Sequence, residues 1–282
     1  IHNAADNPKI MGDMILRRLK KILGTIPTAV VMAFIMLPVV LVVWMSFFDQ
    51  KIITFPPKGY TIEWYTVLAE KSTFADAALL SLEVALISSV LAIVLGCLAC
   101  IGLKQKFFRG KNLMETMFLA PLTVPTIVSG IAIYAFLTVM GNSIGMKLVP
   151  NTWVLILGHT VITIPWAVRL ISAGLAGVNP ALEEAALSLG ANRVYTYVKI
   201  IFPQIRSSLV TASIFSFIVS LTNLEMSLML IKPGQTTLPI ETLNYVLWEM
   251  DPSIAALTTV QIMLIFMLLV IANKLIGLSK VF

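Results

Sequence analysis

The chain has 282 residues, of which 58% are apolar and only 12% are charged, and its net charge is +6. Soluble domains carry about 25% charged residues, so this composition excludes a chain that covers its own surface in water. The sequence also lacks basic patches interleaved with aromatic residues, which argues against a nucleic-acid partner. The composition therefore predicts that membrane lipid surrounds the chain.

A basic segment precedes the first long apolar run. Residues 10–22 read as a basic amphipathic helix that lies on the membrane surface. A simple basic flank that sets the membrane orientation fits these residues equally well. We expect residues 1–22 to form a cytoplasmic segment and residues 23–282 to form a transmembrane domain.

Six apolar runs are long enough to cross a hydrocarbon core of about 30 Å, which takes about 20 residues of helix. Their length and the absence of period-two alternation exclude the strands of a membrane barrel. We therefore predict an all-α membrane protein with six transmembrane helices. The runs lie near residues 23–48, 76–103, 113–140, 152–175, 207–231 and 253–278.

Lysine and arginine residues are spread unevenly over the two sides that six spans define. Fifteen of the 20 fall on the side that holds both termini. Because cytoplasmic loops carry the excess of basic residues, both termini are predicted to be cytoplasmic. The loop at residues 176–206, between the fourth and fifth runs, then lies on the same side.

Motifs for catalysis are missing from the sequence. The one Gly-Lys pair, Gly110-Lys111, has Gln105 where the first glycine of a phosphate-binding loop belongs. Neither a Gly-x-Ser-x-Gly elbow nor an HExxH sequence occurs. The two cysteines, Cys97 and Cys100, lie among small residues of the second run, so we interpret them as packing residues rather than a redox or metal site. We predict that the chain is not an enzyme and holds no metal.

The loop at residues 176–206 carries the local signals of two short helices. Asn179 and Pro180 are typical of a helix start, and Gly190 is typical of a left-handed helix end. Four apolar residues share one face at helical spacing: Leu182, Ala185, Ala186 and Leu189. A second amphipathic stretch covers residues 193–202, and Pro203 breaks it before the fifth run. A short helix held by a turn suits insertion into a groove on a partner, although an ordinary amphipathic loop is the alternative.

The same loop resembles the EAA motif of bacterial ABC-importer permeases. It reads Glu-Ala-Ala, three residues, Gly, nine residues and Ile-x-Phe-Pro, with Phe202 where the family usually has Leu. Segments at residues 120–125, 159–175, 236–240 and 250–257 resemble the same family. In that family the loop docks on a separate ATPase subunit. The resemblance therefore assigns ATPase coupling to Glu183, Glu184, Ala185, Ala186, Gly190, Ile200 and Pro203.

The resemblance implies a type I ABC importer permease with a MetI-like fold in the bacterial inner membrane. It implies a second permease subunit, with a heterodimer favoured over a homodimer. It also implies two cytoplasmic ATPase subunits and an extracytoplasmic solute-binding protein, which meets the loops at residues 49–75 and 232–252. ATP and Mg²⁺ would bind the ATPase subunits, and this chain would bind no cofactor. Two alternatives from other classes are a secondary transporter, with Glu83, Glu225 and His159 as a proton relay, and a membrane scaffold. Inverted repeats would favour the secondary transporter, and none is evident.

Within the permeases, the chain resembles the branch that imports polyamines, iron, thiamine and opines. Members of that branch carry a Ser-Phe-Asp-Glu pattern where this chain has residues 220–225. Here Thr222 and Asn223 replace the acidic pair, and an acid is displaced to Glu225. This departure speaks against a simple polyamine assignment.

Polar residues inside the spans are costly, so each is a candidate for the solute path. The candidates are Glu225, Asn223, Thr222, Ser227 and Glu83. They predict a path for a cationic or amine-bearing solute, or else hydrogen bonds between helices and acids that stay wet near the interface. For His159, a buried hydrogen bond to a neighbouring helix is favoured over a proton relay.

Overall fold

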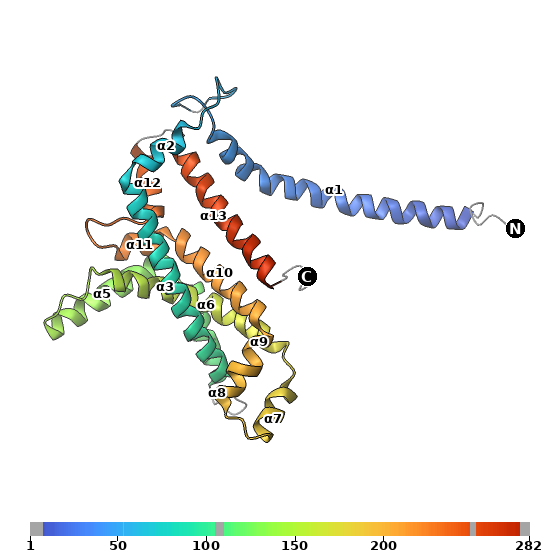
Figure 1. The fold of residues 1–282 in the computed structure, drawn as a ribbon, viewed down its shortest axis with the longest axis vertical. Coiled ribbons are helices and arrows are strands. Elements are labelled where there is room, and N and C mark those ends of the chain that lie inside the picture. The colour runs from blue at the N-terminus through green and yellow to red at the C-terminus, as the bar shows by residue number, and fades with distance from the viewer. Residues whose placement is uncertain (1–7, 53, 105–109, 249–251, 277–282) are drawn as a thin grey trace. The chain divides into compact units, whose positions relative to one another are not determined.

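The computed structural model describes residues 8–52, 54–104, 110–248 and 252–276. Helices make up most of this part of the chain (Figure 1), and Phe48 and Tyr60 form an isolated bridge. Five of the described helices are long and apolar enough to cross a membrane, or six if the bent pair Arg193–Gln204 and Arg206–Thr222 forms one span. The predicted all-α membrane fold is confirmed.

The chain divides into two units, the first of which comprises residues 1–65 and 251–259. Its helix α1 (Pro8–Met45) is continuous, so the surface helix predicted at residues 10–22 runs into the first span without a break. Beyond α1, the Trp64 indole donates a hydrogen bond of 2.7 Å to the Phe48 carbonyl, and the Ser46 and Tyr65 hydroxyls lie 2.7 Å apart. These bonds fold the segment that follows α1 back onto its end.

The second unit is built on α3 (Ser72–Leu103), α6 (Thr152–Ala176) and α10 (Arg206–Thr222). The first two match the predicted spans to within four residues. Small residues let these helices approach closely, as expected in membranes. A Cβ added at Gly96 would lie 3.0 Å from that of Ala167, and one added at Gly174 would lie 2.6 Å from that of Ser208.

The predicted third and fifth spans are each broken in the structure. The third is divided into α4 (Lys111–Leu119), the 3₁₀ turn η2 (Ala120–Leu122) and α5 (Thr126–Ile144). The fifth consists of α10 and α11 (Leu224–Leu230). The expectation of two continuous helices is therefore wrong. Two prolines flank the first break, and the second lies where Asn223 caps α11 with its side chain.

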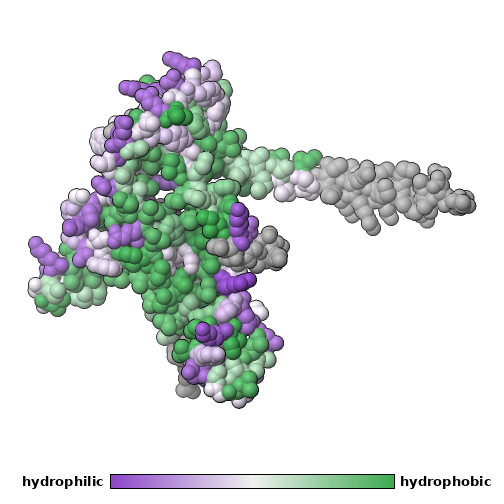
Figure 2. Space-filling view, viewed as in Figure 1, coloured by the Kyte–Doolittle hydropathy of each residue, from purple (hydrophilic) through white to green (hydrophobic). Residues whose placement is uncertain are grey.

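One further helix and the part of another that starts at residue 260 complete the second unit. The backbone N–H of Leu238, at the start of α12 (Leu238–Trp248), donates a hydrogen bond of 2.7 Å to Ser81 of α3. Residues 264 and 268 of α13 (Ser253–Ile276) pack beside Phe217 and Leu221 of α10. Figure 2 shows apolar side chains over the middle of this bundle and polar ones gathered at the end that carries α7 and α8.

Candidate functional site

The loop at residues 176–206 begins with a short, fully capped helix, α7 (Pro180–Ser188). The Asn179 side chain accepts a hydrogen bond of 3.0 Å from the Ala181 N–H, and Pro180 occupies the first turn. At the other end Gly190 has a φ of +86°, and the N–H groups of Gly190 and Ala191 bond back to the carbonyls of Leu187 and Ala186. These paired bonds form a Schellman motif, which needs a left-handed residue. The predicted helix start and the predicted role of Gly190 are confirmed.

The apolar face of α7 is turned away from its own chain. Of the four residues predicted to share that face, only Ala186 is buried, at 6% exposure, whereas Leu189 is 89% exposed. Leu189, Gly190 and Tyr195 line a shallow pocket of about 480 Å³, together with Ala186 and Ile200. Val194, Tyr195 and Val198 of the following turns are also at least half exposed, and a group of exposed apolar side chains is typical of a surface that another protein covers.

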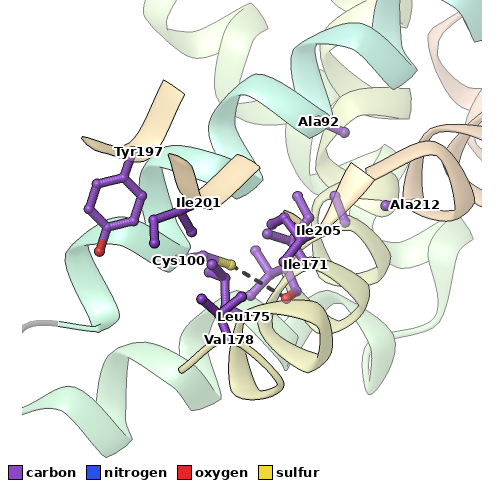
Figure 3. Packing of buried hydrophobic residues seen from close by; sticks show 11 residues of the cluster. Ala92, Cys100, Ile171, Leu175, Val178, Tyr197, Ile201, Ile205 and Ala212 are labelled. Carbon is purple, nitrogen blue, oxygen red and sulfur yellow. Dashed lines mark hydrogen bonds between the residues drawn. The ribbon is translucent and has the colours of Figure 1, made fainter. Parts of the chain in front are cut away.

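The second half of the loop is anchored in the core. It comprises α8 (Arg193–Thr196), the π-helical turn η3 (Tyr197–Ile201) and α9 (Phe202–Gln204). Tyr197 and Ile201 belong to a buried cluster that also includes Cys100 of α3 and Ile171 of α6, and Ile201 lies near Cys100 in Figure 3. The chain then turns by 81° into α10. The break follows Gln204, so Pro203 lies inside α9 instead of ending the preceding helix as predicted.

The two adjacent glutamates of α7 have different surroundings. The Glu183 carboxylate forms an ion pair of 2.9 Å with the Lys104 ammonium, and it accepts a hydrogen bond of 3.3 Å from the Tyr197 hydroxyl. Burial, followed by the charge of Glu183, raises the pKa of Tyr197 to about 12, so the phenol keeps its proton at neutral pH and remains a donor. Glu184 is exposed on the surface of α7. Glu183 thus contacts the body of the protein, whereas Glu184 is exposed and lines a cavity between α7 and the ends of α3 and α4.

A hydrogen-bond network crosses the bundle at His159. This residue is 1% exposed, and its two ring nitrogens lie 2.9 Å from the Ser220 hydroxyl and 3.1 Å from the Ser227 hydroxyl. Ser220 also lies 2.9 Å from the Ser88 hydroxyl of α3. The predicted buried hydrogen bond to a neighbouring helix is confirmed. Ser227, a candidate for the solute path, lies inside this network.

The other candidates for the solute path do not converge. The Glu225 carboxylate accepts a hydrogen bond of 3.2 Å from the Ile127 N–H in the first turn of α5. The Asn223 side chain caps α11 through the Met226 N–H at 2.8 Å. Thr222 lines a separate pocket of about 330 Å³ beside α12 and α13. Glu83 is exposed on α3.

Comparison with known proteins assigns the chain to a family. Residues 88–278 match the binding-protein-dependent transport system inner membrane component. The chain belongs to this family. The spermidine/putrescine transport system permease protein PotC of Haemophilus influenzae is 30% identical to it, over 86% of this chain and 92% of that protein. The putrescine transport system permease protein PotI of Escherichia coli K12 is 28% identical, over 80% of each chain.

Solved structures show the same fold at lower identity. A bacterial ABC transporter involved in the import of the acidic polysaccharide alginate matches with a TM-score of 0.73 at 16% identity, covering 94% of this permease and 97% of that chain. A chain of the MetNI methionine ABC transporter matches with a TM-score of 0.58 at 17% identity, covering 72% and 94%. These likenesses concern the fold alone.

The permease is therefore the membrane-spanning subunit of an ATP-binding-cassette importer, and it takes a solute from a binding protein. It is a multi-pass protein of the inner membrane and not itself an enzyme, because ATP hydrolysis lies on separate subunits. The ion-gradient transporter and the scaffold are set aside by this family membership.

The two cysteines of the permease lie in or against the buried cluster around α3 and α6. Cys100 is buried between α3 and α6, and its sulfur lies 3.2 Å from the Ser172 hydroxyl and 3.5 Å from the Val168 carbonyl. No cluster of three potential metal ligands occurs among the residues that the structure describes.

Two partners of the candidate residues were not predicted from the sequence of the permease. Lys104 lies 79 positions from Glu183, and its charge indicated only membrane orientation. Ile127 lies 98 positions from Glu225 and contributes a backbone group, which no side-chain pattern reveals. The sole sequence signal for the latter contact is the proline at residue 125, which marks a helix start whose N–H groups need acceptors.

Proposed function

We propose that the permease docks an ATPase subunit through the loop at residues 176–206, on the cytoplasmic side, with both termini on that side. The observation that carries this proposal is the outward-facing apolar end of α7. Leu189 stands almost fully exposed beside the pocket that Tyr195 lines. A capped helix with an uncovered apolar end fits a groove on a partner protein. The excess of basic residues on this side supports the orientation.

The assembly that we propose contains this permease, a second permease subunit of different sequence and two ATPase subunits that bind ATP and Mg²⁺. An extracytoplasmic binding protein delivers the solute to the loops at residues 49–75 and 232–252. The family description, which names a binding-protein-dependent system, supports the delivery step. Glu184, Ala185 and Gly190 belong to the docking surface, whereas Ile200 packs against the buried cluster and Pro203 lies exposed in α9.

Cysteine chemistry tests the docking site and the orientation together. In a permease with Cys97 and Cys100 replaced by Ala, Leu189→Cys is expected to react with a membrane-impermeant maleimide only from the cytoplasmic side. In the assembled complex the same cysteine should be protected and should cross-link to the ATPase. The matched variant Lys58→Cys should react only from outside. Reaction of residue 189 from outside would overturn both the orientation and the docking site.

For the solute we propose a small cation that bears amino groups. The relatives named as spermidine/putrescine and putrescine permeases support this class. So does Glu225, an exposed carboxylate held at the break of the fifth span by the α5 backbone. A carboxylate inside a membrane span is costly unless it is hydrogen-bonded or hydrated. The ammonium group of a passing solute can form a charge-assisted hydrogen bond with it. Thr222, Asn223 and Glu83 do not surround Glu225, so each of them would contribute to the solute path on its own.

Glu225→Gln is expected to lower transport of a diamine cation about 10-fold, because a hydrogen bond to a charged group exceeds a neutral one by about 1–1.5 kcal/mol. The glutamine keeps an acceptor for the Ile127 N–H, so the yield of intact complex should be unchanged. Glu225→Leu removes the acceptor as well and should lower the yield. The measurement is the initial rate of uptake into reconstituted vesicles. An unchanged rate for the Gln variant at normal yield would show that Glu225 has no part in solute passage.

A further inference from the structure

The docking helix α7 has little apolar packing against the membrane helices. Ala186 is its one buried residue. A cavity of about 810 Å³ lies between α7 and α8 on one side and the ends of α3 and α4 on the other. Its walls include Met114, Phe118 and Leu187. Across this cavity, the direct contact between α7 and the end of α3 is polar.

Glu183 makes those polar contacts. Its carboxylate oxygens bind the Lys104 ammonium at 2.9 Å and the Tyr197 hydroxyl at 3.3 Å. The ammonium also lies 5.9 Å from the centre of the Tyr197 ring. The Lys104 and Glu183 side chains are only 26% and 23% exposed, so solvent screens this pair less than an open surface pair. One carboxylate thus joins α7, η3 and the residue that follows α3.

We propose that Glu183 is a positioning residue, which transmits the displacement of α7 to the membrane helix α3 through Lys104. The proposal rests on the docking function proposed above. Helix α3 is unbroken over 32 residues, or about 48 Å at 1.5 Å per residue. Near its other end, Ser81 accepts the hydrogen bond from α12. A movement applied at Lys104 is therefore carried along one continuous helix to the contact with α12.

The chain joins α7 to the core at both ends: residues 177–179 link it to α6, and the route to α10 is less direct. Between α7 and α10 the chain passes through the π-helical turn η3 and then through the bend of 81° after Gln204. Irregular turns and kinks of this kind deform more readily than a straight α-helix. The ion pair gives α7 a connection to the end of α3, which neither of these chain links provides.

The test uses the complete complex in proteoliposomes, with binding protein, putrescine as the probe solute and ATP. The quantity measured is the number of solute molecules moved per ATP hydrolysed. Glu183→Gln is expected to lower this ratio about 5-fold or more, at the lower end of typical coupling between sites. ATPase binding and the basal hydrolysis rate should be retained. The matched control is Glu115→Gln, which breaks the exposed Lys111–Glu115 pair on the neighbouring α4. It should leave the ratio unchanged.

A double-mutant cycle separates positioning from general disruption. Lys104→Met should lower the ratio as far as Glu183→Gln does, and the double variant should be no worse than either. The charge exchange Glu183→Lys with Lys104→Glu should restore most of the ratio. Additive losses, or an exchange that rescues nothing, would contradict the proposal. So would a normal ratio in Glu183→Gln.

The cross-link and the transport ratio together separate a wrong role for Glu183 from a wrong docking site. If α7 does not dock the ATPase, Leu189→Cys forms no cross-link and its accessibility does not change on assembly. If α7 docks but Glu183 does not position it, the cross-link forms and the ratio for Glu183→Gln stays normal. A Glu183→Gln complex that no longer binds the ATPase would also overturn the inference, because Glu183 would then serve docking itself.

Discussion

Replacing Gly190 by valine is expected to lower ATP-driven uptake about 10-fold or more while leaving membrane insertion intact. The glycine adopts a φ of +86°, and the Schellman bonds at the end of α7 depend on it. A left-handed conformation costs an L-residue about 1–2 kcal/mol, and a β-branched residue is an outlier there. Valine therefore opens the turn and displaces Leu189 from the docking surface. The measurement is uptake together with co-purification of the ATPase.

Gly110→Val is the matched control for this prediction. Gly110 has a φ of +95° and, like Gly190, has no atom within 4 Å of an added Cβ. The backbone strain is therefore the same at the two sites, but Gly110 precedes α4 and lies outside the EAA-like loop. Uptake by Gly110→Val should exceed that by Gly190→Val by a wide margin. Equal losses would mean that strain alone, and not the docking turn, accounts for the effect.

Gly174→Ala is expected to destabilise the permease by about 1–3 kcal/mol, the usual cost of overpacking a tight contact. An added Cβ at this site would lie 2.4 Å from the Ser208 hydroxyl oxygen and 2.6 Å from its Cβ. The Ser208 hydroxyl can rotate away, but its Cβ is fixed to the backbone, so α6 and α10 must move apart. The measurements are the yield of folded permease and its thermal stability in detergent. Uptake should fall in parallel with both.

Two further variants make this prediction specific. An added Cβ at Gly102 of α3 has no atom within 4 Å. Gly102→Ala should therefore leave the stability unchanged or raise it by up to about 1 kcal/mol, because alanine favours the helix more than glycine does. Ser208→Gly in the Gly174→Ala background removes the opposing Cβ and should restore most of the lost stability. If the double variant were as unstable as the single one, close approach of the two helices would not be the reason for the glycine.

Features that depend on neighbouring residues could be predicted from the sequence. The approximate bounds of α3 and α6 follow from long runs that are mostly apolar, because mean hydropathy over 20 residues reports the cost of leaving lipid. The start of α7 at Asn179 and its end at Gly190 follow from hydrogen bonds that span a few residues. The chain's family follows from the same short motif, now supported by the match over residues 88–278.

The breaks in the third and fifth spans show where such reasoning stops. The mean hydropathy of a long apolar window does not reveal the two prolines, Pro121 and Pro125. A single polar residue such as Asn223 also does not lower that mean enough to end a predicted span. In the structure these residues end one helix and begin another, because an N–H group is missing or a side chain caps the next turn. Likewise, the apolar spacing of α7 defined one face but not whether that face is buried or exposed.

The sequence by itself determined that this is a helical membrane permease with a capped loop helix of the ABC-importer type. Only the tertiary structure decided which polar groups meet. It placed Glu183 on Lys104, Glu225 on the first turn of α5, and Ser227 in the network of His159 rather than beside Glu225. The reason is physical: helical periodicity fixes the face on which a side chain lies, but the partner of that face depends on how distant helices pack.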